Sequence, residues 1–85
     1  MLRIVVPVFT DRGHHRKLPW YVGLPKSAAN GLARDGEVDA SQVKSLSVDR
    51  FHDMAGVVTS RQLNDVLDAI VLCLGYEPEQ SGAVE

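Results

Sequence analysis

One segment close to the C-terminus has a helix-start signal at one end and a helix-stop signal at the other. Its sequence predicts an amphipathic helix. Its apolar residues recur with the spacing of one helix face: Leu63, Val66, Leu67, Ile70, Val71 and Leu74. Thr59 and Gln62 have the spacing of a capping box, and Gly75 is the residue type that commonly ends a helix. We expect the apolar stripe to pack on a sheet, so that Leu67→Asp would unfold the domain by burying an unpaired charge.

The residues before the helix form short β-rich runs. These runs occupy residues 3–10, 18–24, 38–48 and 54–58. The first is apolar almost throughout, which predicts a strand buried on both faces with a bulge or edge at Pro7. The third alternates with one slip, for which a bulge near 41–42 accounts. The pattern predicts an α+β fold, with an antiparallel sheet and one C-terminal helix, in a single domain over 1–76; we expect 77–85 to be disordered.

Composition sets limits on what such a domain does. Of the 85 residues, 45% are apolar, which is too many for a disordered chain. The net charge of −2 excludes a generally polyanion-binding composition, so contact with nucleic acid requires a local patch. Cys73 is the one cysteine, which excludes an internal disulfide, and we expect it to act as a small hydrophobe in the helix. Because no apolar stretch reaches the ~18 residues of a membrane span, we expect a cytoplasmic protein.

A basic loop follows the first β run. It contains Arg12, His14, His15, Arg16 and Lys17. Such a loop can hold RNA phosphates and stack an imidazole on a base, and either histidine could transfer protons near neutral pH. The alternative is a solvated hairpin tip whose charges prevent edge aggregation. His14, His15 and Asp11 could in principle bind zinc, but no third well-spaced ligand is evident, so we predict no metal and no cofactor.

Four segments, taken in order, resemble those of a known toxin family. They are Val6-Pro7-Val8-Phe9-Thr10, Leu18-Pro19-Trp20 through Leu24-Pro25, Ser41-Gln42-Val43-Lys44-Ser45-Leu46, and Gly56 to Leu63. Their order and spacing resemble the PemK/MazF family of mRNA-cleaving toxins over roughly residues 3–75. The resemblance implies a small SH3-like β-barrel with an appended helix. It also implies a homodimer that binds single-stranded RNA and a cognate antitoxin.

The resemblance further implies metal-independent RNA cleavage by attack of a ribose 2′-oxygen, which leaves a cyclic phosphate. Transferred position by position, it implies a catalytic role for Thr10 and RNA contacts from Gln42 and Lys44, beside the basic loop. Gln42 and Lys44 would share one strand face, although a solvated outer face is the alternative.

This chain departs from the family pattern in three places. The family's leading Arg-Pro-Val segment has no counterpart here, Phe9 stands where many members have threonine, and Ser41 stands where the family prefers an acidic residue. Two alternatives therefore remain open. One is a catalytically degraded relative that binds only an antitoxin or RNA, and the other is an unrelated small α+β interaction domain.

Overall fold

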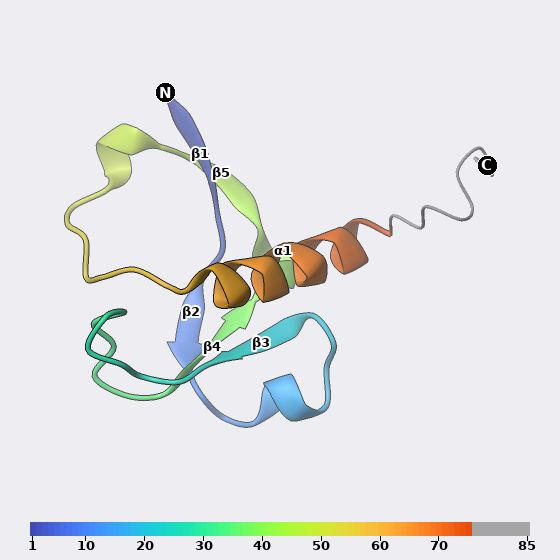
Figure 1. Cartoon of the computed structure of the whole chain (residues 1–85). Coiled ribbons are helices and arrows are strands. Elements are labelled where there is room, and N and C mark those ends of the chain that lie inside the picture. Colours follow the sequence, from blue (N-terminus) through green and yellow to red (C-terminus); the bar gives the residue numbers. More distant parts are fainter. Residues whose placement is uncertain (76–85) are drawn as a thin grey trace, which may run out of the picture.

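The computed structural model describes residues 1–75 as two antiparallel sheets and one long helix (Figure 1). The predicted disordered tail at 77–85 lies outside the described residues. The strands are β1 (Leu2–Val5), β2 (Val8–Thr10), β3 (Tyr21–Leu24), β4 (Gly36–Asp39) and β5 (Lys44–Ser47), and the helix is α1 (Ser60–Leu74). Short 3₁₀ turns occupy His14–Arg16, Ala40–Gln42 and Val48–Arg50.

The chain passes between the two sheets twice. β1 pairs with β5, whereas β4 is the centre of the sheet β2-β4-β3. The predicted strand at 3–10 is divided at Pro7, which has no N–H for a ladder, although its carbonyl accepts from the Asp39 amide at 3.2 Å. The predicted bulge near 41–42 is instead the 3₁₀ turn that carries the chain from β4 to β5. These described strands form two separate sheets and no closed barrel, so the α+β prediction is confirmed without the barrel.

The prediction of a first strand buried on both faces is wrong. Leu2 and Ile4 of β1 are 64% and 70% exposed, because β1 pairs only with β5. The predicted return strand begins later, at Tyr21, after a turn in which the Tyr21 amide donates to the Leu18 carbonyl.

The segment at 54–58 is not a strand. The Val57 amide donates to the Ala29 carbonyl at 2.8 Å, and Gly56 passes so close to Ala29 and Asn30 that a Cβ there would clash with their backbone. Asn30 and Gly31 form a turn in this loop, with Gly31 at a φ of 69°. The segment therefore packs against this loop through single contacts and forms no ladder.

The helix is as predicted at both ends. Thr59 Oγ1 accepts from the Gln62 amide at 3.0 Å, Gln62 Oε1 accepts from the Thr59 amide at 2.9 Å, and Gly75 closes the helix at a φ of 74°.

The buried side of α1 differs from the predicted stripe. α1 packs on β3 and on the turn after β4, with Ala69 buried, while Leu67 is 48% exposed. The prediction that Leu67 is buried is therefore wrong, and the burial from which unfolding by Leu67→Asp was expected is absent. Cys73, expected to act as a small hydrophobe in the helix, is exposed. Among the described residues, no helix is long and apolar enough to cross a membrane.

Candidate functional site

The alternation of β4 divides the three-stranded sheet into an apolar and a polar face. Val38 is buried, and its neighbours across the sheet are Val8 and Val22. Glu37 and Asp39 lie on the opposite face, because side chains two apart share one face of a strand. Both are buried, at 1% and 4% exposure, and the 11–17 loop covers Glu37. The polar face is where the predicted site residues meet the sheet.

Glu37 anchors the basic loop. Its Oε1 accepts from the His15 amide at 3.1 Å, and its Oε2 accepts from the Arg12 amide at 3.1 Å. His14 Nδ1 lies 2.7 Å from the same Oε2. Burial raises the pKa of the Glu37 carboxyl, but the hydrogen bonds from His14 and the two amides outweigh it and leave the pKa below its ordinary value. Glu37 is therefore a carboxylate that fixes the conformation of the loop.

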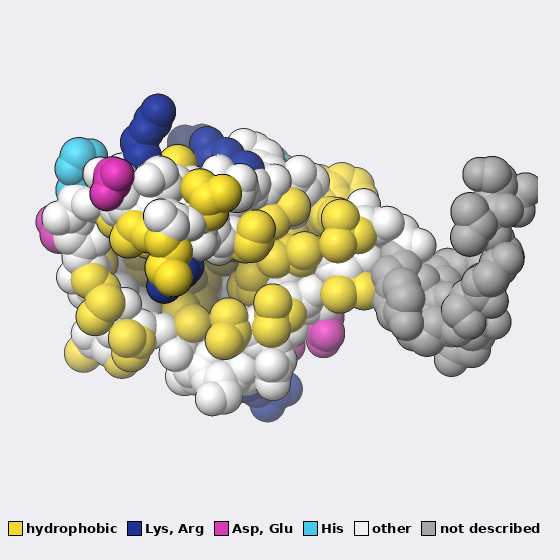
Figure 2. Space-filling model, turned by 90° about the horizontal axis from the view of Figure 1, so that it is seen from above, with side chains coloured by type: hydrophobic (Ala, Val, Ile, Leu, Met, Phe, Trp, Pro, Cys, Tyr) yellow, Lys and Arg dark blue, Asp and Glu magenta, His cyan; other side chains and the backbone are white. Residues whose placement is uncertain are grey.

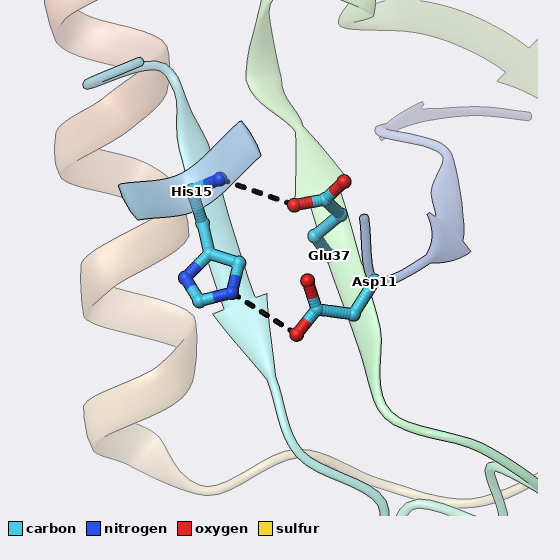
Figure 3. Close-up of side chains that lie close together, drawn as sticks. All are labelled: Asp11, His15 and Glu37. Atoms are coloured by element: carbon cyan, nitrogen blue, oxygen red, sulfur yellow. Dashed lines mark hydrogen bonds and ion pairs between the residues drawn. The ribbon is translucent and has the colours of Figure 1, made fainter. Parts of the chain in front are cut away.

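The His15 ring points toward Asp11, and Figure 3 shows both side chains beside Glu37. His15 Nε2 lies 3.0 Å from Asp11 Oδ2, and Asp11 Oδ1 accepts from the Gly13 amide at 2.7 Å. That amide hydrogen bond and the His15 pairing lower the pKa of Asp11 against the effect of burial. The ring lies so close to Gly23 of β3 that a Cβ there would come within 3.0 Å of it.

Glu37 is the third potential metal ligand that the sequence did not reveal beside Asp11 and His15. One donor atom from each of the three residues lies within 4.8 Å of the other two. Each carboxylate oxygen of this cluster already accepts a hydrogen bond. The contacts therefore describe a hydrogen-bonded cluster that holds the loop.

Asp39 organises the turn after β4. Its Oδ1 accepts from the Ser41 amide at 3.0 Å and from the Ser41 hydroxyl, and its Oδ2 accepts from Gln42 Nε2 at 2.8 Å. Burial raises the pKa of Asp39, but these hydrogen bonds from Ser41 and Gln42 leave it lowered overall. Burial and the negative charge of Asp39 raise the pKa of the Tyr21 phenol, which keeps it protonated. The turn thereby holds the Gln42 side chain beside the polar face.

Two adjoining hollows open at this face. The first, which we call the histidine hollow, has a volume of about 250 Å³ and is lined by Phe9, Thr10, Arg12, His14, Tyr21, Glu37 and Gln42. The second, the arginine hollow, has about 390 Å³ and is lined by Thr10, Asp11, Arg12, Gly13, Arg16, Arg34 and Asp35. Thr10 and Arg12 line both, so an extended ligand could run from one hollow to the other across them.

The predicted site residues are only partly brought together. Thr10, Arg12, His14 and Gln42 share the histidine hollow, and Arg16 lines the arginine hollow. His15 is committed to Asp11, while Lys17 and Lys44 line neither hollow. Gln42 belongs to the 3₁₀ turn and Lys44 to β5, so the expected shared strand face does not form.

Sequence reasoning missed Tyr21, Arg34, Glu37 and Asp39 at this site. The alternation of Gly36-Glu37-Val38-Asp39 was an available signal, since acidic side chains at every second position mark one face of a strand. Nothing in the sequence showed that this face was buried under the basic loop.

Comparison with known proteins gives a consistent result. The sequence model of the "PemK-like, MazF-like toxin of type II toxin-antitoxin system" matches residues 2–74. No curated protein matches in sequence. Among solved structures, an endoribonuclease in complex with its cognate antitoxin from a mycobacterial species is 28% identical with a TM-score of 0.73, over 89% of this chain and 67% of that one.

Two further solved structures are similar. An endoribonuclease from a mycobacterial species is 26% identical with a TM-score of 0.67, over 87% of this chain and 64% of that chain. The Mycobacterium tuberculosis toxin MazF-mt6 is 22% identical with a TM-score of 0.68, over 89% and 72% of the two chains, and shows a shared fold. The present chain thus spans about two thirds of the length of these proteins.

Proposed function

Because the chain belongs to the PemK-like, MazF-like toxin family of type II toxin-antitoxin systems, we propose that it is a toxin-type endoribonuclease acting on single-stranded RNA. The observation that best supports this is the histidine hollow, which brings Gln42 together with Thr10, Arg12 and His14 from a distant part of the sequence. The third reading of the sequence, an unrelated α+β interaction domain, is overturned by the family match.

The side chains of the two hollows suit cleavage by a ribose 2′-oxygen. That reaction needs proton transfer at the attacking and leaving oxygens and a cation for the charge that develops on phosphorus. Arg12 lies between the hollows and supplies the cation, while Thr10 offers a hydroxyl to the same phosphate. Gln42 supplies an amide that can read a base edge, and Arg16 and Arg34 extend the basic surface for neighbouring phosphates.

Incubation with a long single-stranded RNA in the presence of a chelator tests this proposal. We expect fragments with cyclic-phosphate 3′ ends and 5′-hydroxyl ends. Arg12→Ala should lower the cleavage rate by about 100-fold or more, since it removes a charge that stabilises the transition state. Arg50→Ala is the matched control, because Arg50 is exposed on another turn and lines neither hollow. Intact RNA beside a folded wild-type chain would contradict the proposal.

A second function is favoured by the departure at Ser41. Ser41 donates its hydroxyl to Asp39 and lines neither hollow, so it offers no acidic group there. A relative that binds RNA without cutting it would show a stable, salt-dependent complex with intact RNA, weakened by Arg12→Ala but not by Arg50→Ala.

We propose a cognate antitoxin as the protein partner and a homodimer as the assembly. The solved toxin at 28% identity was captured with its antitoxin, which supports the first part of this proposal. Exposed apolar side chains on β1 and α1 support the second. Addition of a matched antitoxin should abolish RNA cleavage, and unchanged cleavage beside excess antitoxin would count against that partner.

A further inference from the structure

The buried Glu37 carboxylate determines which nitrogen of the His14 ring holds a proton. Glu37 is 1% exposed and lies on the central strand β4, so its position is fixed by the sheet. Its Oε2 lies 2.7 Å from His14 Nδ1. Because an ionised carboxylate only accepts hydrogen bonds, Nδ1 must carry the hydrogen. In the neutral ring, Nε2 then has the free lone pair.

The His14 ring is also held from its face. It stacks on the Tyr21 ring with centroids 4.9 Å apart and an interplanar angle of 23°. Its side chain remains 46% exposed and lines the histidine hollow, and none of the described residues hydrogen-bonds Nε2. A ring oriented from two directions, with one nitrogen open to a hollow, has the arrangement of a general base.

The charged and titratable groups around the ring come from three elements. Glu37 faces it from β4, Tyr21 from β3, and Arg12 lies on the same loop and lines the same hollow. Asp39 lies opposite Tyr21 in the register of β3 and β4, and the Asp11–His15 pair lies beside Glu37. Arg12 lines the same hollow as the ring and places a cation where a phosphate would sit.

We propose that His14 is the general base of RNA cleavage, with Glu37 and Tyr21 as positioning residues; this rests on the proposed endoribonuclease function. His14 Nε2 takes the proton from the ribose 2′-hydroxyl as the 2′-oxygen bonds to phosphorus. The bond from phosphorus to the 5′-oxygen breaks, and that oxygen takes a proton from water. The imidazolium then returns its proton to the solvent. A cyclic phosphate and a 5′-hydroxyl result, with no change of oxidation state.

The test measures single-turnover cleavage of single-stranded RNA across a range of pH, with RNA affinity measured separately. His14→Asn keeps a side-chain N–H for Glu37 but removes the group at Nε2. We expect it to lower the rate by about 100- to 10,000-fold while RNA affinity changes little, and to remove the limb of the profile in which the rate rises with pH. Added imidazole should restore part of the rate.

His52→Gln is the matched control, since His52 is exposed and lines neither hollow. His14→Gln is the second variant if His14→Asn does not fold. Glu37→Gln should move the rising limb of the pH–rate profile to a different pH. If Glu37 has only a structural role, the variant should lower the stability of the protein and leave the position of that limb unchanged.

The two proposals fail in different ways. Wild-type protein that leaves RNA intact overturns the endoribonuclease function itself. Wild-type protein that cleaves, while folded His14 variants cleave at the same rate with the same pH profile, overturns only the role of His14. Nitrogen NMR of the imidazole provides a readout independent of activity, and a neutral ring protonated at Nε2 would also overturn it.

Discussion

At the scale of single residues, Glu37 shows how a charge in the middle of a sheet is tolerated. A buried carboxylate is costly unless its oxygens are hydrogen-bonded, and here the amides of Arg12 and His15 and the His14 ring satisfy both oxygens. The same contacts attach the basic loop to β4. Glu37 therefore links the stability of the sheet to the geometry of the histidine hollow.

This arrangement predicts a specific acid dependence of stability. The pKa of Glu37 is lowered in the folded state from an ordinary value of 4.5, so its stabilising contribution is complete above that value and is lost as the pH falls through the folded pKa. Glu37→Gln should be less stable than wild type at about pH 7 and lose less stability between about pH 6 and pH 3. Urea unfolding at each pH measures both quantities.

Some acid dependence should remain in Glu37→Gln, because Asp11 and Asp39 also have lowered pKa values. Asp65→Asn, on the exposed side of α1, serves as the control and should follow the wild-type curve. An unchanged pH dependence in Glu37→Gln would show that the carboxylate is not held as the contacts indicate.

At the scale of elements, α1 is defined mainly by local chemistry. Its capping box satisfies amides that no helical carbonyl can reach, and Gly75 closes the last turn in the left-handed conformation. Thr59→Ala should lower the free energy of unfolding by about 1 kcal/mol, whereas Thr59→Ser, which keeps the hydroxyl, should cost much less. Urea denaturation followed by circular dichroism measures the difference, and equal losses in both variants would contradict the role of the cap.

The strands were harder to predict than the helix because their limits depend on distant residues. Pro7 indicated an irregularity in the first strand. Its role at the change from one sheet to the other depends on β4, whose Asp39 amide donates to the Pro7 carbonyl. Residues 54–58 have a strand-like composition, yet they lie against the loop that contains Asn30 and pair with no strand there. The same limit applied at the site: Thr10, Arg12, His14 and Gln42 were predictable from motif and charge, whereas the burial of Glu37 required the pairing of β2, β3 and β4.

At the scale of the whole molecule, the buried apolar core is small for the apolar content of the chain. Within residues 1–75, the buried hydrophobic residues are Leu24, Val38, Ala40 and Ala69. Large hydrophobic side chains instead remain exposed on β1 and α1, and Figure 2 shows hydrophobic surface spread over one face of the molecule. Extensive exposed apolar surface is typical of an interface, and small domains often depend on a partner for stability. This distribution supports the proposed homodimer.

The exposed side of α1 provides the variant that separates folding from association. Leu67 is 48% exposed, so Leu67→Asp should change the stability of a single protomer by less than about 1 kcal/mol. If α1 contributes to the dimer, the same change places a charge in an apolar interface and should convert the protein to monomers. Sedimentation equilibrium measures the mass, and circular dichroism verifies the fold. Leu67→Met, which keeps the volume, is the control.

The dimer also predicts how the Tm depends on protein concentration. The wild-type Tm should rise with protein concentration, and the Tm of Leu67→Asp should not. A wild-type chain that stays monomeric, with a concentration-independent Tm, would refute the dimer.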